Sequence, residues 1–264
     1  MKRSLINTVM WAVVLLLTVI ALGFVESEQD DRACTNIKIF IDHSNGNFFV
    51  NEEEVNAMVY HEMDTVLGRP ISRIEAGNLE HKLNNHPNIA RAEVYKTLQG
   101  ELVVEVSQRT PIVRIFNSLG ESFYLDSTGK VMPPSKTYTS RVFVANGEIP
   151  DKFVDVNQLN AASLSDSLAE ISLIDDIFRF ADFIRQDRFW SLQIEQLYVN
   201  KDSELELIPR VGNHRIVFGD ATALEGKFRK LKIFYEKGLS KTGWNEYSVI
   251  NLKFADQVVC TKRN

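Results

Sequence analysis

The sequence predicts an α+β protein with an N-terminal transmembrane helix and two exported domains. A long apolar run near the start indicates the helix. A β-α-α-β-β order of periodicities follows, and then short alternating runs and amphipathic helices that indicate a mixed α/β domain with a largely antiparallel sheet. The expected parts are a cytoplasmic N-terminus 1–8, a transmembrane helix 9–25, a linker 26–36, a first domain 37–109 and a second domain 110–264.

The apolar run is long enough to cross a membrane. A bilayer core of about 30 Å needs roughly 20 apolar residues, and residues 5–25 supply them with two polar interruptions near the start. Lys2 and Arg3 precede the run and acidic residues follow it, so the N-terminus is expected in the cytoplasm. A cleaved signal peptide is the alternative, but its apolar core is usually only about 7–15 residues long, and Ala21-Leu22-Gly23 is a poor cleavage site.

The composition of the chain argues against several classes of binding site. The formal net charge of −5 gives no basic surface for nucleic acid, so we expect no nucleic-acid partner. Cys34 and Cys260 are too few for a metal cage and lie at opposite ends of the exported part, so we expect two unpaired thiols. The five histidines lack metal-ligand spacing. We therefore expect no metal, no cofactor and no small-molecule substrate.

The first domain reads as strand, helix, helix, strand, strand. Residues 37–41 alternate as a strand, and Asn51 with Glu54 forms a capping box for the first helix. The second helix ends before Pro87, and residues 89–95 and 101–106 form a hairpin. The expected apolar faces are Val55, Met58, Val59, Met63 and Val66 on the first helix, and Leu79 and Leu83 on the second.

This order within about 75 residues resembles a POTRA domain. The stretches Asn85-His-Pro-Asn-Ile89, 92–94, 102–106 and Gln108-Arg-Thr-Pro111 resemble the end of the POTRA domain in the FtsQ/DivIB family of bacterial division proteins. Pro111 has no amide hydrogen for a sheet and biases the preceding residue toward an extended conformation. We therefore expect one sheet to end and another to begin there.

The second domain begins with strands at 112–116 and 122–125, a tight turn at Asp126-Ser-Thr-Gly129 and the pair Val131-Met132. The segment 123–131 resembles a hairpin of the same family. Residues 141–147 occupy the place of a short family strand but lack its usual proline.

Two helices and three strands follow. Ser167 and Glu170 form a capping box for a long helix, and Thr222 with Glu225 forms one for a second helix that Gly238 should end. Residues 192–199, 205–209 and 215–219 read as a meander. The apolar stripes are Leu168, Ile171, Ile174, Phe178 and Ala181, then Leu224, Phe228, Leu231 and Tyr235; Lys227, Lys230 and Lys237 form a face expected to be solvated.

The segment 248–260 resembles the closing strands of the FtsQ/DivIB family. Asn251 replaces the usual acid, Lys253 the usual arginine and Phe254 the usual tyrosine, and a lysine cannot make the planar bidentate contact of an arginine. We expect residues 250–259 to form a terminal strand whose unpaired edge accepts a partner strand. The candidate partner-binding residues are Tyr247, Ile250, Leu252, Lys253, Phe254, Asp256 and Val258.

The resemblance implies a non-enzymatic scaffold protein that crosses the inner membrane once. Such a protein has its bulk in the periplasm, is enriched at the division septum, links early and late division proteins and helps control septal peptidoglycan synthesis. The resemblance further implies that the POTRA domain contacts upstream or membrane-proximal components. The far end of the β-domain would bind the small coiled-coil proteins FtsB and FtsL.

Two other functions fit parts of the sequence. Ser127-Thr-Gly-Lys130 and Lys241-Thr-Gly243 match two of the three signatures of penicillin-binding acyl-serine enzymes, but the third signature is missing and Ser127 lies in a predicted turn rather than at a helix start. A POTRA-containing envelope assembly protein is the other alternative. Such chains continue into a membrane barrel, for which this sequence lacks both the length and the repeated amphipathic strands.

Overall fold

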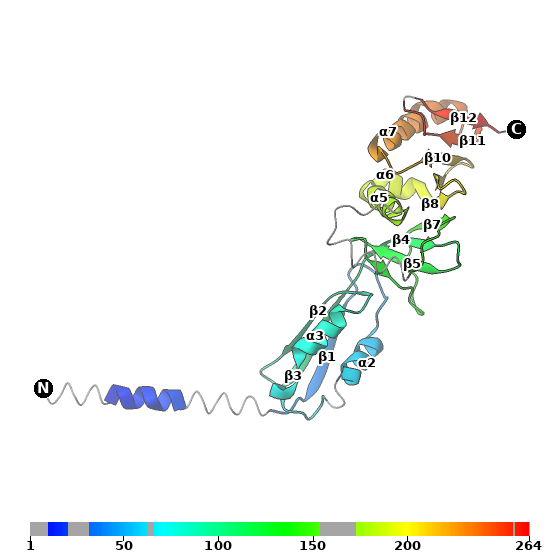
Figure 1. Ribbon diagram of the computed structural model, residues 1–264. Helices are drawn as coiled ribbons and strands as arrows, with labels where there is room; N and C mark the ends of the chain where they lie inside the picture. The colour runs from blue at the N-terminus through cyan, green and yellow to red at the C-terminus, as the bar shows by residue number, and fades with distance from the viewer. Residues whose placement is uncertain (1–9, 21–31, 63–65, 154–172, 256, 264) are drawn as a thin grey trace. The chain divides into compact units, whose positions relative to one another are not determined.

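A computed structural model describes residues 10–20, 32–62, 66–153, 173–255 and 257–263. The chain divides into two compact units, Met1–Gln108 and Arg109–Asn264 (Figure 1). Residues 10–20 are helical, and most of their large apolar side chains are exposed. The remainder of the expected transmembrane helix, 9 and 21–25, lies outside the described residues. Among the helices that are described, none has the length and apolar character needed to cross a membrane.

The first unit has the β-α-α-β-β order that the sequence predicts. The central strand of its three-stranded sheet is β3, which runs parallel to β1 and antiparallel to β2. A short 3₁₀ turn, Ile71–Arg73, precedes α3. The elements are β1 (Asn36–Asp42), α2 (Glu52–Glu62), α3 (Ala76–Asn84), β2 (Ile89–Lys96) and β3 (Glu101–Gln108).

The capping box at the start of α2 is confirmed. The Glu54 amide donates to Asn51 Oδ1 at 2.8 Å, and the Asn51 amide donates to Glu54 Oε2 at 3.4 Å. Of the expected apolar faces, Met58 is only half-buried and Met63 lies outside the described residues. The other five residues are fully buried: Val55, Val59, Val66, Leu79 and Leu83.

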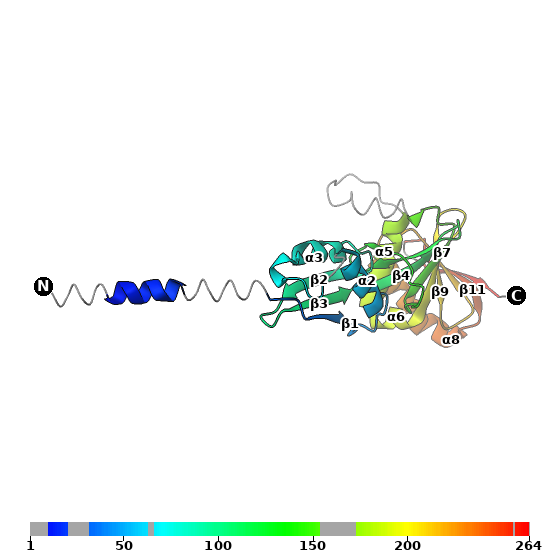
Figure 2. The same cartoon turned by 90° about the horizontal axis from the view of Figure 1, so that it is seen from below.

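The described part of the second unit contains one nine-stranded sheet, in the order β12-β11-β10-β9-β8-β7-β4-β5-β6 (Figure 2). The pairs β4–β7, β7–β8 and β10–β11 are parallel and the other five are antiparallel, so the sheet is mixed with an antiparallel majority. The strands are β4 (Pro111–Phe116), β5 (Ser122–Asp126), β6 (Val131–Met132), β7 (Phe143–Gly147), β8 (Ile194–Val199), β9 (Leu205–Pro209), β10 (Arg215–Gly219), β11 (Tyr247–Asn251) and β12 (Val259–Lys262).

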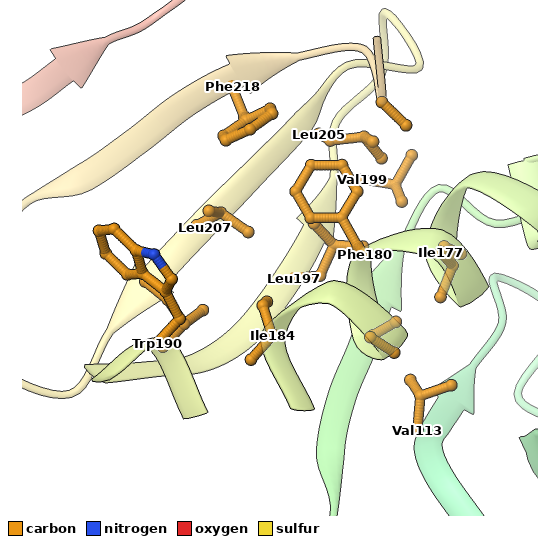
Figure 3. Close-up of a cluster of buried hydrophobic side chains, with 14 of the residues drawn as sticks. Val113, Ile177, Phe180, Ile184, Trp190, Leu197, Val199, Leu205, Leu207 and Phe218 are labelled. Atoms are coloured by element: carbon orange, nitrogen blue, oxygen red, sulfur yellow. The ribbon is translucent and has the colours of Figure 1, made fainter. Parts of the chain in front are cut away.

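The core of the second unit lies between this sheet and three helices, α5 (Leu173–Gln186), α6 (Arg188–Gln193) and α7 (Leu224–Phe234). Figure 3 shows Phe180 of α5 and Trp190 of α6 pointing at side chains of the sheet. The ring of Phe180 meets that of Phe218 edge-on, with centroids 4.7 Å apart. Aromatic packing therefore joins the helices to the β10 end of the sheet.

The buried stripe of α5 differs from the expected one. Ile174 and Ala181 are buried as predicted, but Phe178 is half-buried. Neighbouring side chains of the same helix occupy its expected place in the core. The apolar stripe of an α-helix is wide enough to include either set of side chains. Ser167, Leu168, Glu170 and Ile171 lie outside the described residues. The buried residues of α5 are Ile174, Ile177, Phe180, Ala181 and Ile184.

One predicted strand boundary is wrong. The strand expected from residue 192 begins at Ile194, because Asp187 caps α6, accepting from the amides of Phe189 and Trp190. Leu192 is therefore helical and exposed.

The cap and the end of the last helix are also wrong. Thr222 does not cap α7, since its hydroxyl donates to Asp220 at 2.5 Å and the residue before the helix is Ala223, with φ 49°. Gly238 does not end the helix either. The chain continues through a π-helical segment, Tyr235–Leu239, and the single turn α8 (Ser240–Thr242), and stops at Gly243, where φ is 99°.

Candidate partner-binding site at the edge of the sheet

The closing strands are arranged differently from the single strand expected at 250–259. β11 is paired on both sides, parallel to β10 and antiparallel to β12, and β12 occupies the edge of the sheet. The side-chain oxygen of Asn251 accepts from the amide of Lys253 at 2.9 Å, a local turn that leads the chain away from the ladder. The free edge therefore belongs to β12 (Val259–Lys262).

The register identifies which backbone groups of β12 face outward. The amide of Leu252 donates to the Val217 carbonyl at 2.9 Å, which fixes the side of the ladder that faces β10. Because backbone groups alternate between the two sides of a strand, Val249 and Asn251 turn theirs toward β12. Their partners are Thr261 and Val259. The backbone groups of Cys260, which lies between these two partners, therefore point away from the sheet.

The seven candidate residues do not share one surface. Ile250 and Leu252 are fully buried in the core, and Tyr247 and Val258 are half-buried against it. Lys253 and Phe254 are exposed, and 46% of the Phe254 surface is accessible. Asp256 lies outside the described residues. Among the candidates described, only Lys253 and Phe254 are exposed.

Lys253 is held by an ion pair with Glu204. This pair lies between the end of β11 and the turn before β9, and the bond to the lysine lowers the pKa of the Glu204 carboxyl. Both side chains are partly exposed, so water screens the attraction. The contact orients Lys253 toward Glu204 without removing it from the surface.

The basic face of α7 is not simply solvated, as the sequence suggested. Lys230 Nζ donates to the backbone carbonyls of Leu252, at 3.1 Å, and Phe254. Lys227 Nζ donates to Asp220 at 2.6 Å and lies over the Phe218 ring, 5.1 Å from its centroid. The sequence did not predict either set of contacts, although Lys227 and Lys230 are three residues apart and therefore lie on one face of the helix. The lysines fasten the segment after β11 and the end of β10 to the helix.

A buried histidine packs against the helical segment at the same end of the sheet. His214 precedes β10, and its Nε2 lies 3.0 Å from the hydroxyl of Tyr235 in the π-helical segment. Its ring also stacks near Trp244, with centroids 6.5 Å apart. Burial lowers the pKa of His214 and raises that of Tyr235, because both charged forms lose water. The candidate edge thus rests on an uncharged aromatic support.

The acyl-serine constellation is not brought together. Ser127 and Lys130 belong to the β5–β6 hairpin turn, where Asp126 Oδ1 accepts from the amides of Thr128 and Lys130. Lys241 lies on α8, next to β11. In the sheet β5 and β11 are six strands apart, roughly 29 Å at about 4.8 Å per strand. A catalytic serine and its lysine must lie within hydrogen-bond reach of the same substrate, and these signatures do not.

The cysteines are both free, Cys34 buried and Cys260 half-buried on β12. Burial raises the pKa of the Cys260 thiol. In the described part of the chain, no group of three or more histidine, cysteine and acidic side chains is placed to hold a metal ion.

Comparison with known proteins decides the family. The family model described as "FtsQ/DivIB, C-terminal related" matches residues 110–261, more than half of the chain. The chain belongs to the FtsQ/DivIB family. A POTRA-like domain model matches residues 32–107, ahead of the FtsQ/DivIB match. The FtsQ/DivIB assignment is also supported by a relative from Rhodothermus marinus, named cell division protein FtsQ, which is 24% identical over 203 residues, 73% of this chain and 67% of the relative.

Proposed function

We propose that this protein is a division scaffold that crosses the inner membrane once and captures FtsB- or FtsL-type coiled-coil proteins at its C-terminal sheet edge. The N-terminus lies in the cytoplasm, residues 9–25 form the anchor, and the POTRA domain and β-domain lie in the periplasm at the septum. By holding its partners there, the protein links early and late division proteins and helps control septal peptidoglycan synthesis. Its role is binding rather than catalysis.

The open edge of β12 is the observation that carries this proposal. A partner strand laid along β12 would meet the outward backbone groups of Cys260. Such pairing supplies affinity without a deep pocket, and exposed side chains beside the edge supply specificity. Phe254 and Val259 are 46% and 42% exposed and flank the edge. The buried side chains of Ile250 and Leu252 would contribute indirectly, by holding the strands in register.

A paired substitution separates backbone capture from side-chain capture. Cys260→Pro removes an outward amide, whereas Cys260→Ala removes only the half-buried thiol. In a pull-down through a tag at the N-terminus, we expect the proline variant to lose the FtsB-type partner and the alanine variant to keep it. Equal capture by both variants would remove β-augmentation at β12 from the proposal.

The membrane part of the proposal is tested separately. A reporter that works only outside the cytoplasm, fused after Asn264, should be active and stay in the membrane fraction. Release of a soluble processed form would replace the anchor by a cleaved signal peptide.

A further inference from the structure

A second candidate binding site, a cavity, lies within the β-domain, away from β12. A cavity of about 610 Å³ opens at the amino-terminal ends of the parallel strands β4, β7 and β8. Its size falls within the range of about 300–1,000 Å³ that is typical of ligand sites. β8 and β12 are four strands apart in the sheet, roughly 19 Å at about 4.8 Å per strand. The cavity is therefore separate from the proposed β12 edge.

The cavity exists because β4 and β8 each extend beyond the point in the sheet at which β7, the strand between them, begins. Pairing of β4 with β7 begins at Val113, and pairing of β7 with β8 begins at Gln196. The first two residues of β4 and the first two of β8 thus extend beyond the start of the ladder. The segment 139–142, which leads into β7, belongs to no strand. The sheet is open at this point, and the C-terminal part of α5 borders the opening.

The floor of this groove is apolar. Ile112 of β4, Ile184 of α5 and Ile194 of β8 line it, and each is almost fully buried within the fold. Val142 and Phe143, at the entrance to β7, are half-buried and also line it. A ligand that entered the groove would therefore cover hydrocarbon surface, which favours binding without setting a direction.

The rim of the groove carries an excess of positive charge. Four arginines against one glutamate give 4 − 1 = +3, whereas the whole chain carries −5. Arg185 is paired with Asp182 at 2.6 Å, and Arg114 donates to Ser122 at 2.9 Å. Within the described ranges, the exposed side chains of Arg141 and Arg210 have no hydrogen-bond or ion-pair partner. The charged residues of the rim are Arg114, Arg141, Arg185, Arg210 and Glu195.

We propose that this arginine groove binds an extended acidic peptide segment of a partner protein. In an extended peptide, successive side chains point to opposite faces, so acidic residues can reach the rim while apolar residues enter the floor. Guanidinium groups bind carboxylates through two parallel hydrogen bonds, which fixes the direction of the peptide as well as its charge. Arg141 and Arg210 are the main contacts, because neither has to give up a partner.

The direct test uses the full chain in detergent micelles and fluorescein-labelled hexapeptides. Leucine occupies every second position in each peptide, and the other three positions are all glutamate, all serine or all lysine. We expect fluorescence anisotropy to show binding of the glutamate peptide, with about tenfold weaker binding of the serine peptide and none of the lysine peptide. No binding of the glutamate peptide at low salt, or equal binding of the serine peptide, overturns the proposal.

Charge reversal locates the site. The double variant Arg141→Glu, Arg210→Glu should weaken glutamate-peptide binding at least about tenfold. Arg188→Glu, Arg229→Glu is the matched control, because it changes the charge equally at two exposed arginines outside the groove. Equal loss in both variants would mean that only the overall charge matters and would overturn the proposal.

Two further controls separate this site from other ligands and from the β12 edge. Inorganic phosphate that displaced the glutamate peptide at a concentration where chloride of equal ionic strength did not would overturn the peptide assignment in favour of a phosphate-bearing ligand. Phe254→Ala should leave glutamate-peptide binding unchanged even where it weakens capture of the FtsB-type partner. Failure at one site is thereby distinguishable from failure at the other.

Discussion

The ammonium group of Lys230 on α7 donates a 3.1 Å hydrogen bond to the backbone carbonyl of Leu252, just past the end of β11. The same group bonds the Phe254 carbonyl, so one side chain fixes the course of the chain between the last two strands. We therefore expect the position of the exposed Phe254 ring, and the start of β12, to depend on this contact.

Lys230→Met should loosen this segment while keeping the apolar stem of the side chain. Hydrogen bonds to a charged group are typically worth about 1.5–3 kcal/mol, and partial exposure reduces this to about 1 kcal/mol of unfolding free energy. Partner capture should fall by more than that loss explains, because the segment carries Phe254. Denaturant unfolding and the pull-down measure the two effects. Arg229→Met, at an exposed neighbour, should change neither; an equal effect there would contradict the role of Lys230.

Phe254→Ala and Leu252→Ala should have opposite signatures. Phe254 is half-exposed, so its truncation should leave the melting temperature nearly unchanged and weaken FtsB-type binding by about 2 kcal/mol, roughly thirtyfold. Leu252 is fully buried, so its truncation should cost about 2–5 kcal/mol of stability. Binding isotherms and thermal melts of the two variants test these expected differences. Loss of stability in Phe254→Ala would place that ring in the core instead.

The stability of the β-domain should fall below about pH 6.5 because of His214. An unfolded histidine titrates near pH 6.5, and burial lowers the pKa of His214 in the folded state. Between these two values the unfolded chain binds a proton that the folded chain does not. Stability is therefore complete above the unfolded value and decreases as the pH falls toward the folded one.

Urea unfolding between pH 5 and pH 8, a range of about 3 units around the histidine value, tests this. His214→Gln should flatten the pH dependence of the β-domain, and His81→Gln, at an exposed position in the other unit, should not. His86 also has a pKa lowered by burial, but it lies in the first unit. An unchanged slope in His214→Gln would show that this histidine does not control the transition.

Ser127→Ala should leave stability and cell division intact, because the exposed Ser127 side chain only borders a turn. Asp126 holds that turn. Its Oδ1 accepts from the amides of Thr128 and Lys130, and its Oδ2 accepts from Arg109 at 2.8 Å in a largely buried ion pair. Asp126→Ala should therefore cost about 3 kcal/mol or more. Covalent labelling of the protein by a fluorescent β-lactam, lost in Ser127→Ala, would restore the acyl-serine interpretation.

The local elements were largely predictable because each depends on neighbouring residues. The capping box of Asn51 and Glu54 and the hairpin of β2 and β3 both follow from spacing within a few positions. The continuous strand expected at 250–259 was wrong because apolar alternation persists through a segment that Asn251 turns out of the ladder. Alternation of apolar residues indicates which side chains are buried. A buried side chain does not have to belong to a strand that is paired in the sheet.

The long-range features of the sites could not be predicted in the same way. Lys230 was assigned to solvent because its acceptors are backbone carbonyls, which have no signature in the sequence. The arginine groove arises from the offset between β7 and its two neighbours, and Arg141 and Arg210 come from segments far apart in the chain. Sequence patterns describe each strand but not the relative register of strands that pair in parallel.

The parallel pairing of β10 with β11 sets the order in which the C-terminal edge can be assembled. β12 pairs only with β11 within the described sheet, and β11 joins β10 only after the chain has crossed over through α7. Such non-local pairing forms late, because a long loop must close before the contacts are gained. A newly made chain would thus complete most of its folding before it presented the proposed recruiting strand, and an immature molecule would lack the β12 edge.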